Sequence, residues 1–128
     1  MFDDPGDVPL QIDFVLVPNF SMMAFTSAVE PLRSANRMAG RTLYQWRILS
    51  RDGDPVAASN GIEVLTYGSV ASVERSKVAL LVSGIDVQLY EDEKIFAFMR
   101  RMARQGAVAR KGAGRSANAA GVGYRGRR

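Results

Sequence analysis

Residues 12–37 constrain the fold more than any other stretch, because they read as a strand, a tight turn and a helix in direct succession. Residues 11–17 are almost continuously apolar up to Pro18, which is typical of a strand buried on both faces. After the Pro18-Asn19 turn, apolar residues recur at three- and four-residue steps, and Ser21 is suited to cap a helix. The pattern predicts the opening unit of an α/β domain.

The segments that follow continue this alternation of strands and helices. A second strand, a small hairpin, a buried strand and a helix are expected at residues 44–48, 56–65, 77–82 and 91–105. The Asn60-Gly61 pair marks the turn of the hairpin, which we expect to shield one edge of the sheet. The order predicts a parallel sheet with helices on both faces.

The end of the chain departs from this pattern. Residues 110–128 hold six cations, five glycines and no acid, so residues 1–109 have a net charge of −2 while the whole chain has +4. A strand is expected after Gly106, but its pattern stops at Ala109, and we expect residues 110–128 to be a disordered basic tail. Residues 1–10 read as an acidic lead-in.

Two residue types that carry much of enzyme chemistry are absent. The chain has no cysteine and no histidine, which excludes a thiolate nucleophile, an imidazole base and a Cys/His zinc site. We therefore expect no catalytic residue, no metal and no cofactor. No apolar run is long enough to span a membrane, and the first ten residues do not read as a secretion signal, so we expect a cytoplasmic protein.

Glu30 is the first candidate for a functional side chain. It lies next to the apolar stripe of the first helix, from where it could face a pocket at the carboxyl ends of the strands. The alternative is an exposed carboxylate at a helix restart, because Pro31 lacks the N–H group that continues a helix.

A second group of candidates lies where strands are expected to end. Ser83, Gly84 and Ile85 follow the buried strand at 77–82, and such loops line the ligand crevice of open α/β sheets. The alternative is a plain turn that uses the conformational freedom of Gly84. Phe20, with Tyr44 and Trp46, is available for cation–π contacts, although core packing is the favoured interpretation for all three aromatic residues.

Three segments together resemble a known family. They read FVLVPNFSMMAF and AVEPLRSAN within residues 14–36, then YQWRILSRDGDPVAASNGIEV, and later LLVSGIDV. This sequence resembles the N-terminal domain of GlxA-type regulators in the AraC/XylS family, which is similar to the ThiJ/PfpI, class I glutamine amidotransferase-like fold. The resemblance covers residues 11–108. It implies a flavodoxin-like three-layer α/β/α sandwich that senses a small metabolite.

The resemblance also implies partners and a site. The effector would be amino-acid-related or a quaternary amine, the domain would form a homodimer, and DNA would be bound only by a separate C-terminal pair of helix-turn-helix motifs. The candidate ligand-binding residues are therefore Phe20, Glu30, Ser83, Gly84 and Ile85, and the resemblance adds that Glu30 lies on the helix that carries an acid in the related enzymes. Related enzymes carry a cysteine on a turn that would fall just after Val108, where this chain has the basic segment instead.

These departures lead to a specific expectation. Residues 11–109 would be a partial sensing domain, incomplete at its C-terminus, non-catalytic and without its DNA-binding region. We expect a truncated product, with a reading-frame shift near residues 108–110 as one origin and a native basic tail as the other. Two further functions remain open, an amidotransferase-like hydrolase fragment and a module that binds nucleic acid through residues 110–128.

Overall fold

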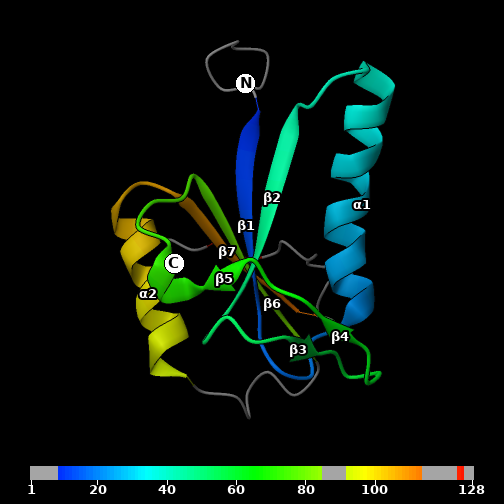
Figure 1. Cartoon of the computed structure of the whole chain (residues 1–128). Helices are drawn as coiled ribbons and strands as arrows, with labels where there is room; N and C mark the ends of the chain where they lie inside the picture. The colour runs from blue at the N-terminus through cyan, green and yellow to red at the C-terminus, as the bar shows by residue number, and fades with distance from the viewer. Residues whose placement is uncertain (1–8, 85–91, 114–123, 126–128) are drawn as a thin grey trace.

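A main sheet lies between two helices in the part of the chain that the computed structural model describes, residues 9–84, 92–113 and 124–125 (Figure 1). The strands of this sheet have the spatial order β5-β2-β1-β6-β7-β8. Neighbouring strands are parallel except β7 and β8, which are antiparallel. The predicted α/β class with a parallel sheet and helices on both faces is confirmed.

The elements follow one another in a simple alternation, with a second, two-stranded sheet formed by β3 and β4. In chain order they are β1 (Leu10–Leu16), α1 (Met22–Ala39), β2 (Tyr44–Ser50), β3 (Val56–Ala57), β4 (Glu63–Val64), β5 (Gly68–Ser69), a 3₁₀ helix (Val70–Ser72), β6 (Val78–Ser83), α2 (Glu93–Arg104), β7 (Val108–Ala113) and β8 (Tyr124–Arg125).

Strand β1 is the centre of the core because it is covered on both faces. Phe14 and Leu16 pack in the cluster on the α1 side of the sheet, whereas Val15 and Val17 pack in the cluster on the α2 side. Alternate side chains of a strand point to opposite faces, so a continuous apolar run fills both layers at once. This is the physical reason why the strand is apolar along nearly its whole length.

Helix α1 begins and ends at the residues that the sequence indicates. The Oγ atom of Ser21 accepts a hydrogen bond from the N–H of Ala24 at 3.1 Å, and Gly40 ends the helix with a φ of 71°. Pro31 lies inside this single helix, so the expected restart does not occur. None of its residues is buried, and Phe25, Val29 and Leu32 pack partly buried against the core.

Helix α2 is packed more deeply than α1. Ile95, Phe98 and Met102 are buried at three- and four-residue spacing against the sheet. Asp92 caps the helix by accepting hydrogen bonds from the N–H groups of Lys94 and Ile95.

The structure differs from the expected end of the ordered domain at Ala109. Strand β7 continues through Ala113 and pairs in parallel with β6 over six residues, from Val78–Val108 to Ser83–Ala113. The pairing is made by backbone groups, which do not require the large apolar side chains on which the sequence expectation depended. The remaining residues of the expected tail lie outside the described residues, apart from the two of β8.

The β3–β4 hairpin forms as predicted, but it does not shield an edge of the main sheet. Figure 1 shows it near the first turn of α1, at the carboxyl ends of the central strands. Backbone hydrogen bonds explain this position: the Asn19 N–H donates to the Ala57 carbonyl at 2.9 Å, and the Ser59 N–H donates to the Phe20 carbonyl at 2.9 Å. The hairpin therefore packs on the β1–α1 turn.

Candidate ligand-binding site

The order of the strands places a switch point between β1 and β6. From β1 the chain crosses to β2 on one side, whereas β6 and β7 lie on the other side. In open α/β sheets, ligands bind outside the carboxyl ends of the strands at such a point. The segment from Val17 to Ser21 and the segment at Ser83 and Gly84 are the described loops that meet there.

These two loops are held together by backbone contacts. The Ser21 N–H donates to the Ser83 carbonyl at 3.2 Å. A Cβ atom on Gly84 would lie 2.3 Å from the carbonyl oxygen of Asn19, much closer than van der Waals contact allows. Glycine is therefore required at position 84.

Asn19 has an unusual conformation in this turn. Its φ is 66°, and no other non-glycine residue with positive φ occurs among the described residues. Asparagine tolerates this left-handed region better than most residues, which explains its place directly after Pro18. The sequence predicts the turn but not this conformation, and the asparagine following a proline is the signal that could have indicated it.

Three of the predicted site residues come together at this end of the sheet. Phe20 is fully buried and packs edge to face on Phe25, with ring centroids 5.9 Å apart. Ser83 is also buried, and Gly84 lies against Asn19. Phe20 and Ser83 thus form the interior wall of the rim and do not present their side chains to solvent.

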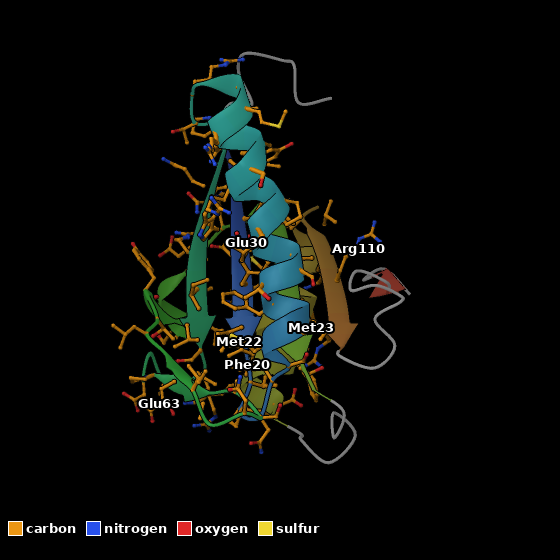
Figure 2. The ribbon with its side chains drawn as sticks, turned by 90° about the vertical axis from the view of Figure 1, so that its right-hand side faces the viewer. Phe20, Met22, Met23, Glu30, Glu63 and Arg110 are labelled. Carbon is orange, nitrogen blue, oxygen red and sulfur yellow. The ribbon has the colours of Figure 1, made fainter. Side chains whose placement is uncertain are left out.

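The other two predicted site residues are not brought to this group. Figure 2 shows Glu30 midway along α1, away from Phe20 at the lower end of the helix. Glu30 is exposed and accepts a hydrogen bond from Arg33 Nε at 2.8 Å. That hydrogen bond raises the pKa of the Arg33 guanidinium. Glu30 is therefore an exposed carboxylate, which was the alternative to a role in the pocket. Ile85 lies outside the described residues.

A cavity of about 180 Å³ opens beside the switch point, between the β1–α1 turn and the loop that joins β2 to β3. Leu16 and Pro18 line one side, and Asp52, Asp54 and Pro55 line the other. No local pattern in the sequence indicates this cavity, because its two walls are thirty-odd residues apart in the chain.

A wider hollow of about 550 Å³ lies along the outer side of β2, where Tyr44, Trp46, Arg47 and Tyr67 contribute to its lining. Tyr44 and Trp46 therefore do not reach the switch point, and both pack partly against the core on the α1 side. In the described structure, only Phe20 of the three aromatic candidates lies at the carboxyl ends of the strands.

Arg47 forms an ion pair with a carboxylate that is completely buried. Its Nε and Nη2 atoms donate to Asp13 Oδ1 and Oδ2 at 2.5 and 2.9 Å, and Asp13 has no exposed surface. The hydrogen bond to Asp13 raises the pKa of the Arg47 guanidinium. The two residues occupy the same register position on adjacent parallel strands. The sequence signal for this pair is the acid within the apolar run of β1.

Two further kinds of site find no support in the described residues. No group of three or more histidine, cysteine, aspartate or glutamate side chains is arranged there to hold a metal ion. Neither described helix has the length and apolar character needed to cross a membrane.

Sequence comparison relates the chain to transcriptional regulators. It is 40% identical over 93 residues to the HTH-type transcriptional regulator CdhR of Pseudomonas aeruginosa, a match covering 73% of this chain and 27% of CdhR. It is 52% identical over 54 residues to the HTH-type transcriptional regulator GlxA of Rhizobium meliloti, covering 42% of this chain and 17% of GlxA. The chain thus spans about a quarter or less of these curated relatives. No model of a known protein family matches it.

Structural comparison agrees with the sequence comparison. An AraC family transcriptional regulator from Pseudomonas putida superimposes with a TM-score of 0.70 at 27% identity, covering 82% of this chain and 55% of that one. A ThiJ/PfpI family protein from Pseudomonas syringae superimposes with a TM-score of 0.58 at 20% identity, covering 86% of this chain and 45% of that one. The chain is therefore similar in sequence to part of HTH-type transcriptional regulators and in structure to part of an AraC family regulator, and its described residues have the ThiJ/PfpI-type α/β fold.

Proposed function

We propose that this chain is the metabolite-sensing part of an AraC-family transcriptional regulator and that operator binding requires a separate helix-turn-helix region. The observation that carries the proposal is the 40% identity to CdhR over 93 residues. In this chain the matching region folds as an α/β domain. The two described helices of that domain are separated by strands, whereas the two helices of a helix-turn-helix motif are adjacent.

The proposed sensing region is the rim at the carboxyl ends of β1 and β6, around Phe20, Ser83 and Gly84. Glu30 is not included, because it is exposed and paired with Arg33 at mid-helix. Ile85 is retained only as the sequence neighbour of Gly84. Support for this region comes from the strand order, which puts the switch point here, and from the unusual backbone of Asn19.

The effector we propose is an amino-acid-related compound or a quaternary amine, sensed in the cytoplasm without being chemically changed. The chain contains neither cysteine nor histidine, so an acyl-transfer mechanism of the amidotransferase kind has no thiolate or imidazole to use. We further propose that the complete regulator is a homodimer, as symmetric assemblies are common among soluble proteins.

The test is a thermal-unfolding screen of the purified chain against amino acids, their methylated derivatives and quaternary amines. A true effector raises the midpoint of unfolding in proportion to the logarithm of its concentration above Kd. Sedimentation of the same chain with and without the effector reports its oligomeric state. A DNA fragment should be bound only weakly and with strong salt dependence.

Three results would contradict the proposal. If no metabolite shifts unfolding, the chain is not a sensing domain on its own. If instead DNA is bound tightly and removal of residues 114–128, which leaves β7 intact, abolishes this binding, the chain is a nucleic-acid-binding module. Hydrolysis of amide substrates that Glu30→Gln eliminates would restore the enzyme alternative.

A further inference from the structure

One face of the main sheet is polar where β1 and β2 begin. Val15 and Leu49 lie on the face that α2 covers, and both pack in the cluster around that helix. Since alternate residues of a strand share a face, the preceding residues on the same face are Gln11, Asp13, Gln45 and Arg47. A strand that is covered on both faces is normally apolar, so these four side chains mark a place where the covering layer ends.

The hollow of about 550 Å³ beside β2 opens at this polar face. Its volume falls in the range of ligand pockets, roughly 300–1,000 Å³. Among the described residues that line it, Arg47 carries the one charged side chain, and the others are two glutamines and three aromatic residues. Figure 1 shows the beginnings of β1 and β2 at the end of the sheet opposite to the β3–β4 hairpin. The hollow is therefore remote from the proposed sensing region.

The guanidinium group of Arg47 is fixed on one edge and on one face. Its Nε and Nη2 atoms donate to the buried Asp13 at 2.5 and 2.9 Å, and its Cζ atom lies 5.6 Å from the centre of the Tyr67 ring. The Tyr67 N–H donates to the Ile48 carbonyl at 2.7 Å, which anchors the backbone that carries this ring. The Arg47 side chain is 25% exposed, and its Nη1 atom has no hydrogen-bond partner among the described residues.

This arrangement presents positive charge to the hollow. Arg47 lines the hollow whereas Asp13 has no exposed surface, so a ligand meets the guanidinium and not the carboxylate behind it. The ion pair also holds the guanidinium in one orientation before any ligand binds, which lowers the entropy cost of binding.

A carboxylate fits a guanidinium group that is held in this way. The free N–H groups at its end form a planar fork that matches the two oxygen atoms of a carboxylate. Gln11 and Gln45 occupy the same register position on β1 and β2 and bring further amide N–H donors to the hollow. Because Asp13 already balances the charge of Arg47, a singly charged ligand is favoured over a doubly charged phosphate.

We propose that this hollow is a binding site for a small carboxylic acid with an apolar body. The carboxylate accepts hydrogen bonds from the free end of Arg47, and the apolar body packs against the ring of Tyr67. The site is separate from the proposed sensing region and does not depend on that function.

The test titrates the full chain with cyclohexanecarboxylate and with its uncharged isostere, cyclohexanecarboxamide, at constant ionic strength. Calorimetry measures affinity, and the fluorescence of Trp46 reports the location, because this lining residue is the only tryptophan of the chain. We expect the acid to bind with a dissociation constant in the millimolar range and to change the fluorescence. The amide should bind about tenfold more weakly, since it lacks the charge that strengthens the hydrogen bonds.

Two variants assign this binding to residues. Asp13→Leu combined with Arg47→Met removes the cation together with its buried partner, so neither charge is left uncompensated. In this double variant the acid should bind no more tightly than the amide, and the thermal-unfolding midpoint shows whether it folds. Tyr67→Ala, at a residue that is 68% exposed, should weaken binding of both compounds about fivefold. Leu65→Ala is the matched control, because Leu65 is also exposed but does not line the hollow.

Several results would overturn the proposal. Absence of binding at about 10 mM, or equal affinity of the parent chain for acid and amide, excludes a carboxylate site. A preference for the acid that persists in the folded double variant shows that Arg47 does not bind the carboxylate. Binding that leaves the Trp46 fluorescence unchanged, or that Leu65→Ala weakens as much as Tyr67→Ala does, places the ligand outside the hollow.

Discussion

Gly84 shows how a single residue can be required by two loops that approach closely. Its missing side chain leaves room for the carbonyl oxygen of Asn19, which a Cβ atom would approach to 2.3 Å. The obstructing atom belongs to the backbone, so it cannot rotate away as a side chain would. The close approach in turn holds the β1–α1 turn beside β6.

Gly84→Ala should therefore lower the free energy of unfolding by about 1–3 kcal/mol, measured by urea denaturation. Gly68→Ala is the control, because its Cβ atom would meet only the side chain of Ser72, with the hydroxyl at 3.0 Å, and an exposed side chain can shift where a backbone carbonyl cannot. Equal losses of unfolding free energy in the two variants would show that the contact with Asn19 is not what excludes a side chain at position 84.

The buried pair of Asp13 and Arg47 is a second feature at the residue scale. Removing one partner leaves the other charge without compensation, and Asp13 has no exposed surface. We expect Arg47→Met to cost about 3–5 kcal/mol of unfolding free energy. The double variant Asp13→Leu with Arg47→Met should be more stable than Arg47→Met alone. Additive effects in this double-mutant cycle would mean that the two side chains do not interact energetically.

The same pair makes a prediction about pH. The pKa of Arg47 is raised in the folded state by its hydrogen bond to Asp13. A raised folded-state pKa stabilises the protein fully at every pH below the unfolded value, and this contribution is lost only as pH rises through the folded value. Because both values are strongly alkaline for arginine, the difference in unfolding free energy between the parent chain and the double variant Asp13→Leu with Arg47→Met should not change between about pH 7 and 9. A steep change across that interval would contradict this assignment.

At the scale of elements, one side chain joins the end of α1 to the start of β2. The Asn36 amide accepts hydrogen bonds from the N–H groups of Leu43 and Tyr44 at 2.7 and 2.9 Å, and it donates to the Tyr44 carbonyl at 2.9 Å. These bonds satisfy backbone groups at the start of β2 on the side that faces away from β1. Strand β5 pairs with β2 only near its end and does not reach these groups. Asn36 thus sets the direction of the connection and covers part of a strand edge.

Asn36→Ala should cost about 2–3 kcal/mol, because it leaves three partly buried backbone groups without partners. Ser34→Ala, an exposed position of the same helix, should change the free energy of unfolding by less than about 0.5 kcal/mol. Chemical denaturation of both variants checks this difference. A loss in Asn36→Ala no larger than that in Ser34→Ala would mean that water replaces the amide.

At the scale of the whole molecule, the two helical layers are not equally packed. Helix α2 buries three of its residues, whereas α1 buries none and leaves Met23 and Met38 largely exposed at 77% and 87%. The free energy of local opening is smaller where fewer apolar side chains are buried. The α1 layer should therefore open more readily than the rest of the domain. Figure 2 shows α1 standing in front of the sheet with Met23 at its lower end.

Native-state hydrogen exchange should therefore find smaller opening free energies in the middle of α1 than in α2 and β1. Mixing with an effector that binds at the β1–α1 turn should slow exchange in the first turns of α1. Without effector, slower exchange in α1 than in α2 would contradict this prediction. It would mean that a second copy of the chain covers α1 in solution, and dilution should then make exchange in α1 faster again.

Much of the fold was predictable from local pattern, because each signal depends on residues close together in the chain. The capping Ser21, the αL residue Gly40 and the Asn60-Gly61 hairpin turn all occur where the sequence places them. The site was less predictable. Phe20, Ser83 and Gly84 do meet, but as buried walls, and Glu30 lies elsewhere, since residue type alone does not reveal which side of a helix faces a rim.

The sequence by itself determined the α/β class, the central apolar strand and the ends of α1, since hydrophobic periodicity and capping are local properties of a chain. Only the tertiary structure decided that β7 runs on to Ala113, that Asp13 meets Arg47, and that Pro18 and Asp54 face one cavity. Each of these depends on strand register or on contact between distant segments. Such relations are settled when the sheet assembles, because backbone pairing and packing then bring together residues that no local pattern connects.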